Sequence, residues 1–335
     1  MEKRSELDFL NVIMCVFVVF IHIISKAVTA LDSTSVQYAM VFIPSRLMQF
    51  VVQGFVFLSA FKYFMNNKNE GYFEFIISRF KKIYVPYVVW NVIFYLLLIP
   101  LGYFIFNIVE LLKYILLGNM ISHFYFVVII MQFYLLMPLW KWALCNVNNK
   151  ILLIISFVLM IVFGNYVLVG YKYSDRIFVK YIFYWIFGCV AGKNSEQFFG
   201  LIKKNIKVIT ILFIIAALSD STLSLLNSLG VYRVSFLENI HIIYCILAIV
   251  FLLAVWKNRK TVDNLAFKII NKESYNIYLS HCIVLYYVDY FMNRIEVYDM
   301  ALGIIARVVG CWAAMVLLWG ANYHYQSKKH RLSGS

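Results

Sequence analysis

Ten apolar runs separated by short connections divide this chain almost from end to end. Most of them have close to the roughly 20 residues that an α-helix needs to cross the hydrocarbon core of a bilayer. Because lipid offers the backbone no hydrogen-bond partner, each run should be helical despite its β-branched and aromatic residues. The runs are 9–29, 47–65, 83–106, 122–140, 151–170, 178–192, 206–226, 238–256, 275–292 and 300–323. We therefore expect an all-α polytopic membrane protein of about ten transmembrane helices.

Composition supports the membrane class. The 335 residues are 63% hydrophobic and only 14% charged, against about half and about a quarter in soluble domains. The net charge of +14 would suggest nucleic acid as a partner of a soluble chain. Here the basic residues lie in the short connections between apolar runs, so we attribute them to topology. The expected partner is the lipid bilayer, with no nucleic acid.

The placement of lysine and arginine predicts the orientation. With the N-terminus inside, 21 of the 30 basic residues fall on the inner side and eight on the outer side, with Arg307 inside the last run. Positively charged connections resist translocation. We therefore expect both termini in the cytoplasm, a single transmembrane domain over residues 1–326 and a basic cytoplasmic tail over 327–335.

The first run permits a second interpretation. Lys3 and Arg4, the apolar stretch and residues 28–30 together resemble a secretory signal with a cleavage site. Glu6 and Asp8 dilute the basic segment, however, and the apolar run is long enough to span a membrane. We favour a first transmembrane helix.

Cysteine and histidine spacing predicts no metal site. The six cysteines lie singly and mostly inside apolar runs, without a CxxC pair, and are expected to pack as small hydrophobic residues. The six histidines are scattered, and none has the HExxH spacing that places two ligands on one helix face. A GxxxG pair at Gly188 and Gly192 is typical of close helix packing.

Ionisable groups inside a bilayer are costly, so each needs either a function or a buried partner. His22, Asp8 and Asn11 lie within about 40° of one face of the first helix. Asp8 would nevertheless stand roughly 21 Å from His22, too far to share a proton directly. His22 and Asp8 are the candidate catalytic residues. A neighbouring helix that satisfies His22 is the alternative to its catalytic role. The other candidates are Asp220, His241, His281, Asp289 and Arg307, with His123 near a boundary.

Three further groups of polar residues are candidates. Arg79, Lys81 and Lys82 precede Pro86, where they could hold the phosphates of a cytosolic donor or simply mark the inner side. His281 and Asp289 lie on nearly the same face of one helix, about 12 Å apart, and could line one cavity. His123 and Tyr125 open the fourth run, where aromatic residues are common in any case. His123, Tyr125, His281 and Asp289 are therefore expected to bind substrate or to be structural polar residues.

Five short motifs occur in one order along nearly the whole chain. They are residues 6–10 followed by His22, residues 54–59, residues 78–83 with Pro86 and Tyr87, residues 123–126 leading into 132–136, and residues 278–281. Together they resemble the membrane acyltransferase family 3. Within this family, the compact length and the stretch 127–150 look most like members from the biofilm loci that make the exopolysaccharide poly-N-acetylglucosamine.

The resemblance implies a ten-helix enzyme of the bacterial cytoplasmic membrane. Such an enzyme moves an acyl group, acetyl or succinyl, from cytosolic acyl-CoA to a hydroxyl of an extracytoplasmic polysaccharide or envelope glycan. His22 matches the essential histidine of the first helix, and Arg79 with Lys82 matches the basic pair credited with binding coenzyme A phosphates. Asn11 departs from the pattern, since the family commonly has Arg or Lys there.

Two functions follow as hypotheses. In the first, the chain is an O-acyltransferase with His22 as general base. In the second, it is an export component for an exopolysaccharide, in contact with glycan synthase subunits. A glycan conduit needs a continuous polar and aromatic lining, whereas the polar residues here are sparse, so we prefer the enzyme. A purely structural role in an assembly is a third possibility.

Overall fold

The computed structural model describes residues 4–66, 70–232, 236–257, 262 and 264–333. Every regular element within these ranges is a helix, so the all-α prediction is confirmed. Five of the basic residues used to predict the orientation lie outside the described residues: Lys3, Lys68, Arg233, Arg259 and Lys260.

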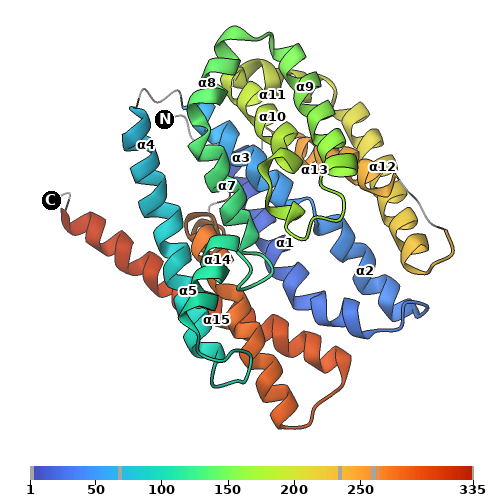
Figure 1. The fold of residues 1–335 in the computed structure, drawn as a ribbon, viewed down its shortest axis with the longest axis vertical. Helices are drawn as coiled ribbons and strands as arrows, with labels where there is room; N and C mark the ends of the chain where they lie inside the picture. The colour runs from blue at the N-terminus through green and yellow to red at the C-terminus, as the bar shows by residue number, and fades with distance from the viewer. Residues whose placement is uncertain (1–3, 67–69, 233–235, 258–261, 263, 334–335) are drawn as a thin grey trace. The chain divides into compact units, whose positions relative to one another are not determined.

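The chain forms two compact units, Val52–Gly200 and Glu2–Val51 with Leu201–Ser335. Figure 1 colours the chain along its length. The first unit holds α3 (Val51–Met65), α4 (Tyr72–Arg79), η1 (Phe80–Tyr84), α5 (Val85–Leu98), α6 (Ile108–Leu117), α7 (Tyr125–Leu135), α8 (Met137–Asn146), α9 (Asn149–Val162), η2 (Phe163–Val167), η3 (Ser174–Arg176), η4 (Phe178–Tyr181), α10 (Ile182–Lys193) and the start of α11 (Ser195–Lys204). The second holds α1 (Ser5–Ala30), α2 (Val36–Met48), α12 (Ile206–Ser228), α13 (Leu237–Trp256), α14 (Leu265–Arg294) and α15 (Met300–Ser333).

Seven helical stretches in the described part of the chain are long and apolar enough to cross a membrane. They are Ser5–Ala30, Val36–Met65, Tyr72–Leu98, Asn149–Val167, Ile206–Ser228, Leu237–Trp256 and Met300–Gln326. An eighth span results if α7 and α8, which meet at an angle of 55°, are taken as one broken span. The chain is therefore a polytopic membrane protein.

The two remaining predicted runs are also helical. The sixth corresponds to α10, which has only 12 residues. The ninth lies within the 30 residues of α14, which is long enough but is not among the helices of the described residues that are apolar enough to cross a membrane. The number of ten spans stays a prediction, as does the orientation of the termini.

The second span begins earlier than the sequence predicted. Helix α2 starts at Val36, where the hydroxyl of Ser35 accepts a hydrogen bond from the Tyr38 N–H at 3.1 Å, and α3 follows after a two-residue break. The prediction that Arg46 lies in an outer connection is wrong, because Arg46 lies in the last turn of α2. At the other end of the chain, α15 continues through most of the predicted tail, to Ser333.

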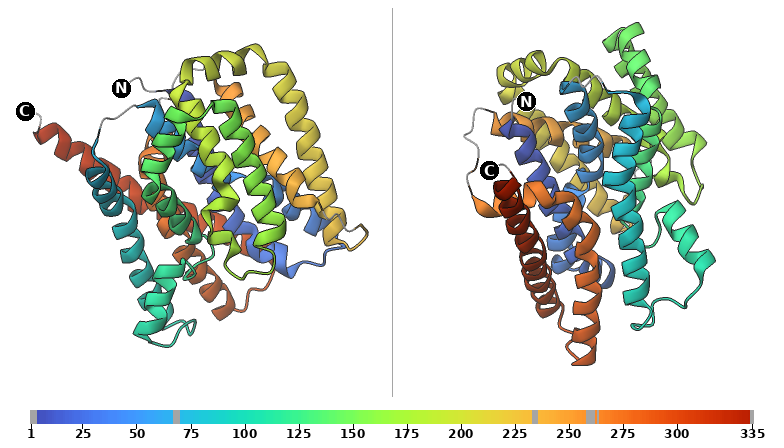
Figure 2. Two further views of the ribbon diagram at one scale, coloured as in Figure 1. Left: turned by 45° about the horizontal axis from the view of Figure 1, so that its top comes forward. Right: turned by 90° about the vertical axis from the view of Figure 1, so that its left-hand side faces the viewer.

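In the second unit, α1 contacts α2, α13, α14 and α15. Phe9 of α1 stacks on Trp256 of α13 with ring centroids 3.9 Å apart. Helices α14 and α15 run antiparallel, and α12 packs along α13 (Figure 2). Helices α2, α13, α14 and α15 thus pack against α1, which carries the predicted catalytic histidine.

In the first unit, α10 approaches α3 very closely. A Cβ atom at Gly188 would overlap the backbone oxygen of Phe57, and one at Gly192 would overlap that of Phe61. The predicted role of this GxxxG pair in helix packing is therefore confirmed, since only glycine permits the approach.

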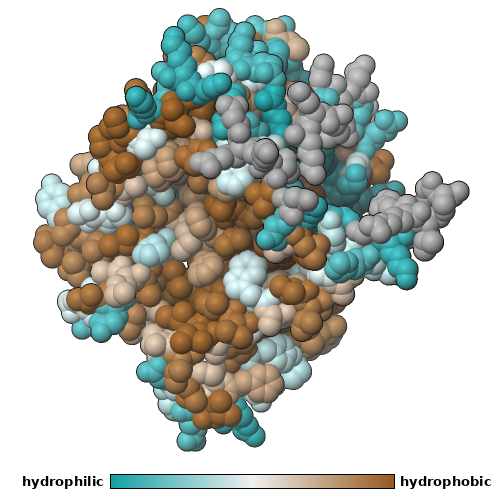
Figure 3. Space-filling model, turned by 180° about the vertical axis from the view of Figure 1, so that it is seen from behind, coloured by the Kyte–Doolittle hydropathy of each residue, from teal (hydrophilic) through white to brown (hydrophobic). Residues whose placement is uncertain are grey.

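Large apolar side chains remain exposed on many helices. Leu317 of α15 is 73% exposed, Val309 62% and Ile211 of α12 58%. Hydrophobic residues dominate the face shown in Figure 3. Such a surface is unfavourable in water and matches the acyl chains of a bilayer.

Candidate active site

The predicted site residues are divided between the two units. Asp8, His22, His281 and Asp289 belong to the second unit, and Arg79, Lys81, Lys82, His123 and Tyr125 belong to the first.

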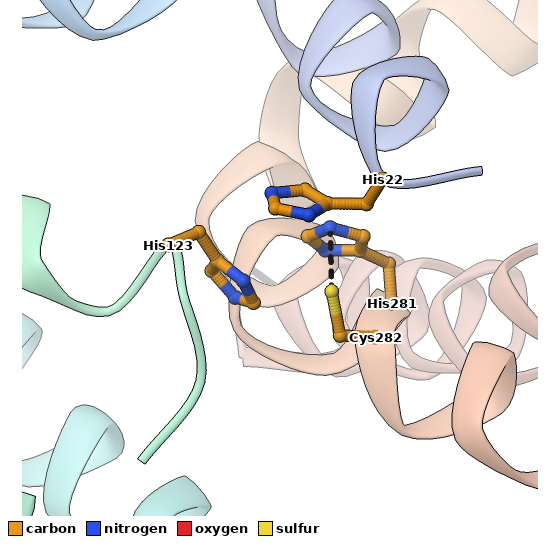
Figure 4. Close-up of side chains that lie close together, drawn as sticks. All are labelled: His22, His123, His281 and Cys282. Atoms are coloured by element: carbon orange, nitrogen blue, oxygen red, sulfur yellow. Dashed lines mark hydrogen bonds between the residues drawn. The ribbon is translucent and has the colours of Figure 1, made fainter. Parts of the chain in front are cut away.

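The imidazole rings of His22 on α1 and His281 on α14 pack against each other. Their centroids lie 5.2 Å apart and the ring planes are inclined by 49° (Figure 4). Nearer the N-terminus of α1, the amide of Asn11 donates to Oδ1 of Asn271 on α14 at 2.8 Å. The predicted polar stripe of α1 therefore holds for Asn11 and His22, since both lie against α14. Pairing with His281 was not predicted.

Hydrogen bonds hold the His281 ring in one orientation. Nδ1 lies 3.0 Å from the backbone oxygen of Ile277 and 2.9 Å from that of Tyr278. A carbonyl oxygen only accepts, so Nδ1 carries the proton and Nε2 presents a lone pair in the neutral ring. The thiol of Cys282 lies 3.4 Å from this Nε2, and His281 is fully buried. His281 is thus a fixed neighbour of His22.

Arg307 of α15 contacts both α1 and α14. One of its terminal nitrogens donates to the backbone oxygen of Ile23 at 2.6 Å, directly after His22. Its Nε lies 3.4 Å from Oδ1 of Asp289, and Nζ of Lys26 lies 3.5 Å from the same oxygen. Asp289 therefore has two cationic partners, of which Arg307 is buried and Lys26 is about half exposed.

The structure does not bring Asp8 to His22. Both lie on the continuous helix α1, 14 residues and about 21 Å apart by helical rise. Asn11, at the position where the family commonly has a cation, also donates to Oγ of Ser274 at 3.1 Å. It acts as a neutral helix-packing residue in this chain.

Three of these side chains could bind a metal ion. Donor atoms of His22, His281 and Cys282 lie within 4.8 Å of one another. Imidazole nitrogens and cysteine thiolates are both ligands that Zn²⁺ takes in proteins. Because they come from helices far apart in the sequence, ligand spacing along the chain did not reveal them. The expectation of no metal stays a prediction.

In the first unit, the predicted donor-binding residues lie at and just before a π-helical turn. Arg79 ends α4, and its guanidinium lies 5.1 Å from the ring of Phe75 and 5.4 Å from that of Tyr134. Lys81 and Lys82 are exposed on the π-helical turn η1.

Pro86 explains this turn. Proline has no N–H to donate to the carbonyl of residue 82 and its ring clashes with that carbonyl in a regular α-helix. The wider π-turn relieves the clash, with the Val85 N–H donating to the Phe80 oxygen. Such turns occur often at functional sites.

His123 and Tyr125 lie at the start of α7. His123 is 5% exposed in the preceding turn, and its ring packs edge-on against Phe124 with centroids 4.8 Å apart. Tyr125 is the first residue of α7 and is hydrogen-bonded to Tyr181. Both residues contribute to the packing of the first unit, and their substrate role stays a prediction.

A second buried polar cluster was only partly predicted. Asp220 of α12 is fully buried and accepts from Arg46 through Nε at 3.2 Å and a terminal nitrogen at 3.0 Å. Nδ1 of His241 on α13 lies 2.9 Å from Oδ2 of Asp220. The sequence indicated that Asp220 and His241 need partners. The position of Arg46, directly before an apolar run, was the available signal for the third member.

Comparison with known proteins decides the family. The acyltransferase domain of membrane acyltransferase family 3 matches residues 4–320. The chain belongs to this family. The match extends across both compact units and confirms the resemblance found in the five motifs.

Curated relatives carry a different description. The chain is 25% identical over 302 residues to probable poly-beta-1,6-N-acetyl-D-glucosamine export proteins of Staphylococcus aureus, strains Mu50 and MSSA476. The aligned region covers 84% of this chain and 82% of each relative. No solved structure matches the chain.

Proposed function

We propose that this chain is a membrane O-acyltransferase with His22 as general base. It would move an acetyl or succinyl group from acyl-CoA to a hydroxyl of an extracytoplasmic polysaccharide or envelope glycan. The observation that carries the proposal is the ring contact of His22 with His281, whose own orientation is fixed by its helix. A chain of the acyltransferase family with such a pair in its interior has a positioned imidazole available for proton transfer.

The chemistry requires only proton transfer and orientation from the protein. His22 takes the proton of the acceptor hydroxyl as its oxygen attacks the thioester carbonyl. The carbon–sulfur bond then breaks, and the coenzyme A thiolate receives the proton from the imidazolium of His22. General-base catalysis of this kind contributes roughly 10² to 10⁴-fold. Exclusion of water by the surrounding helices limits hydrolysis of the thioester.

On the donor side, Arg79, Lys81 and Lys82 would hold the coenzyme A phosphates. Lys81 and Lys82 are exposed and so can reach a soluble ligand, while Phe75 and Tyr134 hold Arg79 in place. Charge-assisted hydrogen bonds to phosphate are strong. This side of the protein would face the bacterial cytoplasm. Both termini would lie on the same, cytoplasmic side of the plasma membrane.

An export function is the second candidate, favoured by the names of the Staphylococcus aureus relatives. In that case the chain would move an exopolysaccharide such as poly-N-acetylglucosamine, together with glycan synthase subunits. A conduit requires a continuous polar lining. Between α1 and α14, by contrast, polar side chains are hydrogen-bonded directly to one another, for example Asn11 to Asn271. This direct pairing supports the enzyme function.

Acyl transfer in proteoliposomes separates the two functions. The donor is acetyl-CoA or succinyl-CoA with a radiolabelled acyl group, on the side of Lys81 and Lys82, and the acceptor is a β-1,6-linked N-acetylglucosamine oligosaccharide on the other side. Label on the oligosaccharide is expected. Passage of unmodified glycan across the membrane without labelling would instead establish export.

A further inference from the structure

A cavity of about 160 Å³ lies in the second unit where α1 and α14 end and α15 begins. Its polar lining comes from Lys26, Asp289, Asn293, Tyr298, Asp299 and Arg307. Room for one water takes about 10–15 Å³ of such volume, so the cavity is large enough for several waters or for one small ring-shaped ligand.

The charges around this cavity balance. Lys26 and Arg307 carry positive charge, Asp289 and Asp299 negative charge. Asp289 lies between the two cations at 3.5 and 3.4 Å. A site for phosphate or for a nucleotide needs an excess of cations. A neutral ligand with several hydroxyl groups, which both donate and accept, fits these alternating charges better.

The cavity lies close to the proposed general base. Lys26 follows His22 by four residues on the same helix, about 6 Å along its axis and on nearly the same face. Arg307, which lines the cavity, donates to the backbone oxygen of Ile23, the residue after His22. One wall of the cavity, at Lys26, therefore begins about one helical turn along α1 from His22.

The C-terminal end of α14 forms part of the rim of the cavity. The N–H of Glu296 donates to the Asn293 oxygen at 3.2 Å, and that of Val297 to the Met292 oxygen at 3.0 Å. Helices often end in this pattern of hydrogen bonds, usually with glycine in the left-handed conformation. Here Glu296 takes that position, with φ of 55°. The turn fixes the backbone of Asn293 and leads into Tyr298, which is 74% exposed.

We propose that this cavity is the acceptor subsite and that it takes one uncharged pyranose unit of an N-acetylhexosamine polysaccharide. The Asn293 amide hydrogen-bonds the sugar and the ring of Tyr298 packs against it. The assignment rests on the proposed function for its connection to His22. Its ligand can be measured independently of acyl transfer.

The test is equilibrium binding of a tritiated β-1,6-linked N-acetylglucosamine trisaccharide to the full chain in nanodiscs. Asn293→Leu removes the amide at similar volume, and Tyr298→Ala removes the ring. Each should weaken binding about tenfold, the loss expected for one good hydrogen bond or packed ring. Tyr290→Ala is the matched control, since Tyr290 is an exposed tyrosine of α14 that does not line the cavity, and it should bind within twofold of wild type.

Two further measurements make the result decisive. Asn293→Gln keeps an amide and should retain more affinity than Asn293→Leu, and thermal unfolding of each variant identifies a folding defect. Excess inorganic phosphate should leave trisaccharide binding unchanged. Failure of the wild-type chain to bind, equal binding by all variants, or competition by phosphate would each overturn the assignment.

Acyl transfer in the same nanodiscs distinguishes this proposal from the proposed function. Transfer that Asn293→Leu and Tyr298→Ala leave unchanged would overturn the subsite while the enzyme stands. Trisaccharide binding that depends on Asn293 and Tyr298, with no transfer by any variant, would support the subsite while the enzyme falls.

Discussion

His22 of α1 and His281 of α14 are in ring contact, although they are 259 positions apart along the chain. The Nδ1 proton of His281 is donated to backbone oxygens of its own helix, so this ring cannot turn without losing a hydrogen bond. A fixed ring beside His22 limits the orientations that the proposed base can adopt. Such positioning is what general-base catalysis requires.

Removal of the basic charges at the donor site should weaken donor binding. In the double variant Arg79→Gln/Lys82→Gln, the KM for acetyl-CoA is expected to rise about tenfold, because two charge-assisted contacts to phosphate are lost. Added salt should raise the wild-type KM more steeply than that of the variant, since exposed contacts are screened. Initial rates in proteoliposomes measure both effects.

Lys141→Gln is the control for this donor experiment. Lys141 is also a cation over an aromatic ring, that of Tyr63 at 5.5 Å, but it is outside the predicted donor site. Its KM should stay within twofold of wild type. An unchanged KM in the correctly inserted double variant would show that Arg79 and Lys82 serve topology alone.

The buried cluster of Arg46, Asp220 and His241 should be important for stability. Asp220→Asn leaves the Arg46 guanidinium without its carboxylate, and breaking a buried ion pair in this way costs about 3–5 kcal/mol. Thermal unfolding in detergent should therefore show a large fall in Tm. Glu110→Gln breaks the exposed pair with Lys113 and should have little effect. Equal shifts for the two variants would contradict this role of the cluster.

Chelation tests the prediction that no metal takes part. The Cys282 thiol already has the His281 Nε2 as acceptor at 3.4 Å, so it can keep its proton rather than bind a metal as thiolate. A zinc chelator should leave acyl transfer unchanged, and Cys282→Ser, which keeps a donor, should stay active. Zinc bound at one equivalent, with activity lost on chelation and restored by zinc, would contradict the base mechanism.

The predicted orientation can be tested by cysteine labelling. In a Cys145→Ser background, the remaining five native cysteines are buried. Single cysteines placed at Tyr72, Ser195 and Leu265, within the predicted inner segments 66–82, 193–206 and 257–273, should react with an impermeant maleimide only after permeabilisation. Reaction of any two from outside would overturn the predicted topology.

Periodicity and hydropathy predicted the helical class and the face of α1 that carries Asn11 and His22, because both follow from the regular geometry of a helix in lipid. They did not predict that this face meets His281. That contact depends on which helices are neighbours, and a single sequence contains no signal for it.

Arg46 illustrates a second limit. Hydropathy placed it outside the membrane segments because a lone arginine in an apolar helix is costly. Its carboxylate partner, Asp220, follows 174 residues later, so the compensation was not visible locally. The cavity at Lys26 was missed for the same reason, since its walls come from three helix ends.

Replacement of His22 tests the central claim most directly. In His22→Gln, acyl transfer from acetyl-CoA to the glycan oligosaccharide should fall by roughly 10² to 10⁴-fold, because the amide keeps hydrogen bonding but cannot take the proton. His22→Ala should behave alike, with insertion and Tm close to wild type, since removal of a neutral ring leaves no buried charge unpaired. Transfer at the wild-type rate by either variant would contradict the account and favour the export function.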